Sequence, residues 1–496
     1  MNYVAVRGDK IKPQNVSRET FCKTLAGRGE KMRQEKDLLG KREVPEEVYY
    51  GIHTLRALEN FPLSGYRVSP ILIKAIALIK KAAAEVNSEL GYLPAALAQA
   101  IAGAADEVMD GKWQEQFVVD ALQGGAGTST NMNVNEVLAN RAIELLGGKL
   151  GNYDLVHPLN HVNLHQSTND VYPTALRIAA IWLLKPLSDS CALLQTALQE
   201  KEAEFAGVIK VGRTEMQDAV PIMLGQEFSA YAGAIARDRW RLYKVEERLR
   251  QAALGGTAVG TGLNADKKYI FMVNDRVRQQ AGIGLARAEN MIDVIQNADV
   301  FVEVSGLLKA LAVNLGKIAH DLRLLSSGPR AGLGEIKLPE RQAGSSIMPG
   351  KVNPIIPEAV NQVAYHVMAS DMAISMAAQS GQLELNAFMP LITHHLLESL
   401  AMLTNAVNIL NQFCIQGITA NVERCNALLQ NSQVSVTALV PHIGYDLASK
   451  VARLAQEENI TVRQAALQLG VLPEDKIDAA LDPRVMTRPG IGGKAR

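Results

Sequence analysis

A leucine repeat near residue 315 constrains the fold of this chain more than any other feature. Its apolar residues recur at alternating spacings of three and four, namely Leu308, Leu311, Leu315, Ile318, Leu322 and Leu325. This spacing places them on one face of an α-helix of the kind found in helix bundles. Residues 228–254 and 359–379 are also long and helix-prone, and helices approaching ~25 residues indicate a long bundle. Runs of β-branched residues with period two are missing, so we expect an all-α protein.

The rest of the chain divides into shorter segments. Residues 37–66 are expected to be irregular, and 71–90 and 95–110 to be helical, the second helix following Pro94. Tyr172-Pro173-Thr174 opens a further long helix. We expect four parts, namely an N-terminal extension (1–34), an N-terminal helical domain (35–167), a central long-helix domain (168–421) and a small C-terminal helical domain (422–496).

Composition excludes several classes of function. Lysine plus arginine equals aspartate plus glutamate at 51 each, so nothing in the charge balance favours nucleic-acid binding. No apolar run approaches the ~18 residues of a membrane span, and residues 1–34 lack the apolar core of a secretory signal. Four scattered cysteines indicate reduced thiols, which makes the cytoplasm the expected location. The leucine-rich helix is apolar around much of its girth, so we expect a homo-oligomer.

Histidine spacing raises the question of a metal site. His157, His161 and His165 stand four apart and would share one face of a helix. Pro158 and the neighbouring polar residues favour irregular chain instead, and the adjacent pair His394-His395 would diverge from a helix. We therefore expect no metal.

Residues 344–358 form the strongest candidate for chemistry. Gly344 and Gly350 let the backbone approach a ligand, and Ser345, Ser346 and Lys351 supply two hydroxyls and a cation. Asn353 is a plausible cap for a helix opened by the prolines that follow it. A loop that ends at a helix N-terminus, with a cation beside it, suits an anionic ligand. A solvated surface loop is the competing interpretation.

Three more polar stretches resemble ligand-binding loops. Residues 123–135 combine three glycines with hydroxyls and amides, and 157–170 form a polar run ending in Ser-Thr-Asn-Asp. Residues 212–221 form a third polar loop, in which Arg213 and Asp218 could pair with each other. Taken alone, the first stretch is explained equally well as a capped glycine-rich turn. In the second, Ser167, Thr168 and Asn169 are either capping residues or anion donors, and the two roles are compatible.

Together, these four stretches resemble the signature regions of the fumarase/aspartase superfamily, and the resemblance extends from about residue 37 onward. Residues 49–57, 124–129 and 355–358 are more similar to aspartate ammonia-lyases than to class II fumarate hydratases. The resemblance implies a three-domain, all-helical protomer. It also implies a homotetramer with a twenty-helix core, whose active sites each draw on three subunits, and no organic cofactor.

The resemblance further implies anti elimination of ammonia from L-aspartate to give fumarate, through an aci-carboxylate intermediate. Ser345 would be the general base that removes the C3 proton. The β-carboxylate would be held by Thr128, Ser167, Thr168 and Ser346. The α-carboxylate would be held by Thr214, Lys351 and Asn353, with Asn169 near the amino group. Hydroxyl donors aimed at the aci-carboxylate would stabilise its charge as it develops.

Residue 215 departs from the family pattern, because Glu215 stands where relatives carry His or Gln. Its carboxylate could be protonated, face a substrate ammonium, or turn away to pair with an arginine. It could also indicate a related or N-substituted aspartate as substrate. A fumarate hydratase and a catalytically silent homologue are the competing functional hypotheses. His165, beside the Ser-Thr-Asn-Asp run, is a further departure.

Overall fold

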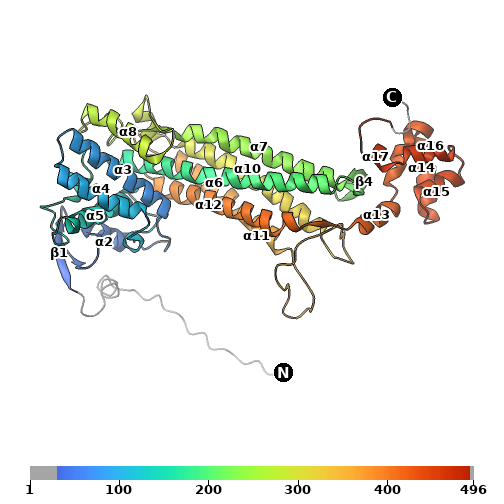
Figure 1. Cartoon of the computed structure of the whole chain (residues 1–496), viewed down its shortest axis with the longest axis horizontal. Helices are drawn as coiled ribbons and strands as arrows, with labels where there is room; N and C mark the ends of the chain where they lie inside the picture. The colour runs from blue at the N-terminus through green and yellow to red at the C-terminus, as the bar shows by residue number, and fades with distance from the viewer. Residues whose placement is uncertain (1–30, 492–496) are drawn as a thin grey trace, which may run out of the picture. The chain divides into compact units, whose positions relative to one another are not determined.

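The computed structural model describes residues 31–491, and these are mainly helical (Figure 1). They form two compact units. Unit 1 holds residues 31–179, 250–298 and 377–394; unit 2 holds residues 180–249, 299–376 and 395–491. No helix within the described part of the chain is both long enough and apolar enough to cross a membrane.

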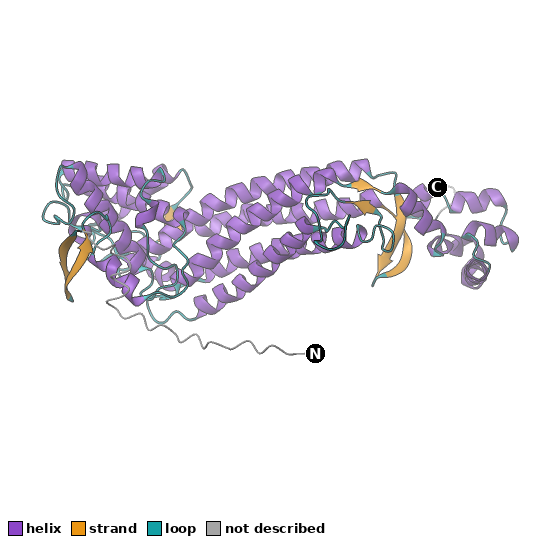
Figure 2. Cartoon of the chain, turned by 90° about the horizontal axis from the view of Figure 1, so that it is seen from below, coloured by secondary structure: helices purple, strands orange, loops and turns teal. Residues whose placement is uncertain are grey.

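Long helices dominate unit 2. They are α6 (Thr168–Glu204), α7 (Leu224–Leu249), α10 (Asp299–Leu325), α11 (Ile355–Gln379) and α12 (Met389–Phe413), the first and last of which begin in unit 1. Helix α10 packs along α7 (Figure 1), and Figure 2 shows long helices running lengthwise together. All six residues of the leucine repeat are buried on α10. The expected long-helix bundle is therefore confirmed.

Unit 1 is built from shorter helices. Their bounds are α2 (Ile52–Asn60), α3 (Pro70–Glu89), α4 (Ala95–Met109), α5 (Thr128–Leu145), α8 (Lys267–Ala281) and α9 (Met291–Gln296). Helix α3 packs against α4 and α8, and α4 packs against α5. Small and branched apolar residues of α3 fill the space between them, with Leu72, Ile76 and Ile79 fully buried. The helices expected at 71–90 and 95–110 are confirmed.

The part of the chain that the structure describes also contains four two-stranded sheets, which were not expected. The antiparallel pairs are β1 (Met32–Asp37) with β2 (Gly40–Pro45), β3 (Ile209–Thr214) with β4 (Gln217–Met223), and β7 (Ile336–Lys337) with β8 (Thr419–Ala420). β5 (Gln251–Ala252) pairs in parallel with β6 (Ala286–Arg287). The prediction of irregular chain over 37–66 was wrong at the β1–β2 hairpin and at α2, and the prediction of a loop at 212–221 was wrong at the β3–β4 hairpin. Charged residues on both faces of β1 and β2 hide the apolar alternation that signals a strand.

The C-terminal segment has a small core of its own. Its helices are α13 (Val422–Gln430), α14 (Val440–Glu457), α15 (Val462–Gln468), α16 (Glu474–Ala480) and α17 (Pro483–Met486). Leu439, Val451, Val462 and Ile477 are buried together there. The four-part division of the chain stays a prediction, and its extension (1–34) lies almost wholly outside the described residues.

Candidate active site

Thr128 is the first residue of α5, and a glycine turn delivers it. Gly127 has a φ of 95° and serves as the N-cap. A Cβ at residue 127 would lie 2.3 Å from Cδ2 of Tyr172, which is buried in the second turn of α6. Only glycine therefore fits between the two helix starts. The loop expected over 123–135 is in fact shorter, because the helix begins at Thr128.

Two hydroxyl groups at the start of α6 can donate hydrogen bonds to a ligand. Thr168 Oγ1 accepts a hydrogen bond of 3.2 Å from Asn131 Nδ2, and Ser167 Oγ accepts one of 3.2 Å from the Asn169 backbone N–H. A hydroxyl oxygen that already accepts an N–H still has its own hydrogen to give. This arrangement, at a helix N-terminus, suits a carboxylate ligand.

Asn169 has a defined amide orientation. Its Nδ2 donates to the carbonyl oxygen of Ala258 at 2.8 Å, while its Oδ1 accepts no hydrogen bond within the described residues and is available as an acceptor. An amide oxygen accepts hydrogen bonds, so the donor that suits this position is an ammonium or a hydroxyl.

A glycine-rich loop at residues 255–264 supports this region, and no motif in the sequence had identified it. Buried Asp170 accepts backbone N–H bonds of 3.0 Å from Gly255, Thr257 and Ser167. It therefore ties the loop to the start of α6. Four glycines within eight residues were the signal that could have identified it.

Two buried ionisable residues, Lys80 and Asp170, contact the segment that leads into α6. Lys80 Nζ donates to Asn163 Oδ1 at 2.8 Å and to Gln166 Oε1 at 2.9 Å. Burial lowers the pKa of Lys80 to about 7, against the opposing charge of Asp170. Burial also raises the pKa of Asp170 to about 6, although its hydrogen bonds act in the opposite direction. These contacts fix the turn that leads into Ser167.

The three histidines of this region form hydrogen bonds with nearby backbone and side-chain groups. His161 Nδ1 accepts the His157 N–H, and His157 Nδ1 accepts from Leu159 and Asn160 around a short π-helical turn, Pro158–Val162. His165 Nδ1 lies 2.7 Å from Asn87 Oδ1, an acceptor, so this nitrogen carries the proton. Burial lowers the pKa of all three. Across residues 31–491, no cluster of three or more His, Cys, Asp or Glu could hold a metal.

Thr214 and Glu215 lie at the tip of the β3–β4 hairpin. Thr214 pairs with Gln217, which leaves Glu215 and Met216 as a two-residue turn with φ of 53° and 65°. Such turns favour Asn and Gly, so a Glu-Met turn stores strain. Arg213 contacts Glu335 and Asp218, and the described residues give Glu215 no arginine partner. The hypothesis that Glu215 turns away to an arginine therefore has no support within the described residues, and it stays a prediction.

Ser345 lies on a loop that is closed at its neck. Gly344 N donates to Lys351 O at 2.7 Å, and Asn353 Nδ2 donates to Gly344 O at 2.9 Å. A Cβ at Gly344 would lie 2.8 Å from both the Asn353 nitrogen and the Lys351 oxygen. The sequence position of Asn353 had suggested that it caps α11. Its side chain closes the loop instead.

The hydroxyl of Ser345 is held by backbone donors. Its Oγ accepts from Ile347 N at 3.2 Å and from Met348 N at 2.9 Å. Donors of this kind stabilise an oxyanion and lower the cost of forming an alkoxide. Ser346 and Lys351 are on the same loop, whose Ile347 is 84% exposed.

The predicted site residues thus form two groups. Unit 1 holds the residues assigned to the β-carboxylate and the amino group, namely Thr128, Ser167, Thr168 and Asn169. Unit 2 holds the rest, namely Thr214, Glu215, Ser345, Ser346, Lys351 and Asn353.

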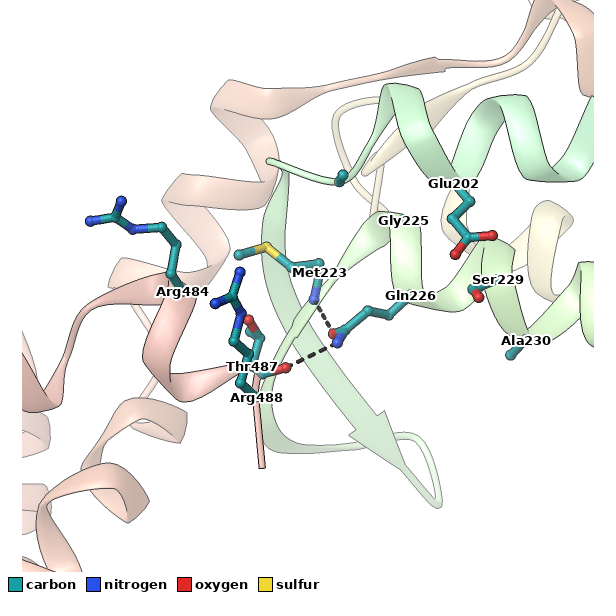
Figure 3. A pocket seen from close by; sticks show the side chains of 10 residues that line it. Glu202, Met223, Gly225, Gln226, Ser229, Ala230, Arg484, Thr487 and Arg488 are labelled. Atoms are coloured by element: carbon teal, nitrogen blue, oxygen red, sulfur yellow. Dashed lines mark hydrogen bonds between the residues drawn. The ribbon is translucent and has the colours of Figure 1, made fainter. Parts of the chain in front are cut away.

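A separate hollow of about 670 Å³ lies in unit 2 and contains none of these residues (Figure 3). Thr487 and Arg488 lie on one side of it, and Glu202 and Ser229 lie on the other. Gln226 bridges its middle, accepting from Met223 N and donating to Thr487 O. Gln226 thus fixes the segment at Thr487 to the start of α7. The hollow is therefore a place where two segments of the chain meet.

A helical-bundle chain with hydroxyls at helix starts and a serine on a glycine-flanked, lysine-bearing loop has the architecture of a lyase for small anionic substrates. Residues 40–369 match the model of the lyase family, and residues 436–488 match the fumarase C C-terminus. The chain therefore belongs to the lyase family.

Known relatives agree with this assignment. The chain is 50% identical over 463 residues to an aspartate ammonia-lyase of a Bacillus species, which covers 93% of this chain and 99% of the relative. A crystal structure of a fumarate lyase:delta crystallin from Brucella melitensis has a TM-score of 0.89 and 49% identity, over 92% of this chain and 100% of that one. Recombinant class II fumarase from Schistosoma mansoni is 37% identical with a TM-score of 0.88, at the same coverage.

Proposed function

We propose that the protein is a carbon–nitrogen lyase that eliminates ammonia from L-aspartate to give fumarate. One observation carries the proposal: the Ser345 oxygen lies between two backbone N–H donors on an exposed loop that also bears Lys351. The 50% identity to an aspartate ammonia-lyase, against 37% to a class II fumarase, favours aspartate over malate.

Ser345 acts in its alkoxide form and removes the C3 proton of aspartate. The carbanion electrons delocalise into the β-carboxylate as an aci-carboxylate. Thr128, Ser167, Thr168 and Ser346 donate to this group and stabilise its growing charge. One such donor contributes about 3 kcal/mol to lowering the barrier.

The second half of the reaction breaks the carbon–nitrogen bond. The electron pair left at C3 forms the C2–C3 double bond, and the C2–N pair leaves with nitrogen. Because the amino group starts as an ammonium, it departs as neutral ammonia. Thr214, Lys351 and Asn353 hold the α-carboxylate throughout. No organic cofactor enters the scheme.

Glu215 and Asn169 would select the amino group. The hydrogen bond from Nδ2 to Ala258 orients the Asn169 amide and leaves its Oδ1 as an acceptor, and Glu215 lies on an exposed turn. An acceptor and an anion together favour an ammonium over a hydroxyl. We therefore assign Glu215 to the substrate ammonium, including that of N-substituted aspartates.

The lyase is proposed to work as a homotetramer whose active sites draw on three subunits. Large apolar side chains of unit 2 helices face outward, namely Trp240, Tyr243, Tyr365 and Met372, which are 54–70% exposed. Large apolar side chains exposed on long helices suit burial between subunits. Light scattering should give four times the chain mass of 53.7 kDa. The cytoplasm suits Cys191, Cys414 and Cys425, which are buried free thiols.

The assay follows the ultraviolet absorbance of fumarate after L-aspartate or L-malate is added. Fumarate from aspartate alone supports the proposal. Fumarate from malate alone identifies a hydratase, and fumarate from neither rejects both.

Glu215→Gln tests the assignment of the ammonium. It should lower kcat/KM for aspartate about tenfold, the effect of ~1.4 kcal/mol, while Asp218→Asn on the same exposed hairpin should change it little. A gain in aspartate activity for Glu215→Gln would mean that the carboxylate merely obstructs the site.

A further inference from the structure

Four charged side chains meet at the base of the β3–β4 hairpin in unit 2. Arg213 Nη1 lies 3.0 Å from both carboxylate oxygens of Glu335. Lys210 Nζ lies 3.2 Å from Glu335 Oε2 and 2.8 Å from Glu227 Oε1. The side chain of Glu335 is 0% exposed and that of Lys210 is 1% exposed. Two cations and two anions therefore balance each other in an interior site.

This cluster connects two parts of the candidate site that are far apart in sequence. Arg213 directly precedes Thr214 on β3. Glu335 directly precedes β7, from which the chain runs into the neck of the Ser345 loop. The backbone of Glu335 is fixed as well, because its N–H donates to Leu325 O and its carbonyl accepts from Asn421 N, both at 2.9 Å.

Stability alone is a poor reason to bury these charges. Replacing a buried ion pair by apolar side chains is often neutral or stabilising, because desolvation offsets the Coulomb attraction. What an arginine–carboxylate contact supplies is a fixed geometry. Here that geometry relates the Thr214 hairpin to the stem of the Ser345 loop.

We propose that Glu335 is a positioning residue of the lyase reaction. By holding Arg213, it fixes the backbone next to Thr214 and so sets the position of Thr214 and Glu215 at the hairpin tip. This assignment rests on the proposed function, in which Thr214 holds the α-carboxylate of the substrate.

The test separates charge balance from position with three variants. Glu335→Gln and Arg213→Gln each leave one buried charge unbalanced, and each should lower Tm and raise KM for aspartate at least tenfold. The double variant R213Q/E335Q restores the balance, with Lys210 facing Glu227. Its Tm should return toward the wild-type value while KM stays raised.

Asp238→Asn is the matched control. Asp238 is also fully buried in unit 2, where it accepts from Arg241 and Asn314 on the bundle helices. This variant should lower Tm and leave KM within twofold of the wild-type value. The proposal is overturned if KM recovers together with Tm in the double variant, or if Glu335→Gln leaves KM unchanged.

Hydrogen–deuterium exchange provides a readout that needs no substrate. Exchange over residues 209–223 and 336–354 should accelerate in E335Q and in the double variant, and stay unchanged in D238N. Unchanged exchange in E335Q contradicts the positioning role. If wild-type protein releases no fumarate from aspartate, the proposed function fails, and the exchange result still decides the role of Glu335.

Discussion

Gly127→Ala should disturb the structure at the start of α5 more than any other single methyl group added there. Gly127 has a φ of 95°, where a side chain costs about 1–2 kcal/mol. Its new Cβ would also lie 2.3–2.7 Å from three ring atoms of Tyr172. Tyr172 is 2% exposed and cannot move away freely, so overpacking adds about 1–3 kcal/mol. The total loss in the free energy of unfolding is about 2–5 kcal/mol.

Gly125→Ala is the control for this prediction. Gly125 also has a positive φ, of 87°, but the nearest atoms to its Cβ are 3.9 Å away on Thr128. It should lose only the backbone contribution of about 1–2 kcal/mol. Urea unfolding of both variants measures the difference. Equal losses would refute the account in which the Tyr172 ring separates the two helix starts.

The G127A variant should also affect substrate binding. Tyr172 lies between the helix start that carries Thr128 and the one that carries Thr168, so pushing the ring outward separates the two hydroxyls. KM for aspartate should rise in G127A more than in G125A.

Two further changes test a buried lysine and a helix cap. Lys80, with a pKa lowered to about 7 by burial, is neutral in the folded chain but protonated in the unfolded chain between about pH 7.5 and 9.5. The free energy of unfolding therefore gains about 1.4 kcal/mol per pH unit from this group as pH rises. Lys80→Met should flatten the slope measured by urea titration, and an unchanged slope would contradict this. In α15, Thr461 and Gln464 form a reciprocal capping box, so Thr461→Ala should cost about 1 kcal/mol by thermal melting while Thr461→Ser costs little. An equal loss in both would show that the cap contributes nothing.

The bundle could be predicted from sequence because its signal is local and repeated. Leu308, Leu315 and Leu322 follow one helical face, and all three are buried. The hairpins gave no such signal. Their strands are short. The β3–β4 turn contains Glu215 and Met216, whereas Asn and Gly at these positions would have predicted a hairpin.

The candidate site could be predicted only in part. Motifs identified Ser345 and Thr168, but the environment that gives Ser345 its character comes from backbone N–H groups, which no residue type encodes. The role of Asn353 was misread, since its bond to Gly344 depends on how a ten-residue loop closes. Glu335 carries no motif at all, and its proposed role rests on a contact with a residue 122 positions away in the chain.

Fumarate release by Ser345→Ala, compared with wild-type protein at saturating L-aspartate, tests the central claim most directly. Loss of a general base should lower kcat about 10²–10⁴-fold, with the oligomer intact by light scattering. A kcat within a few-fold of wild type would show that another group removes the C3 proton.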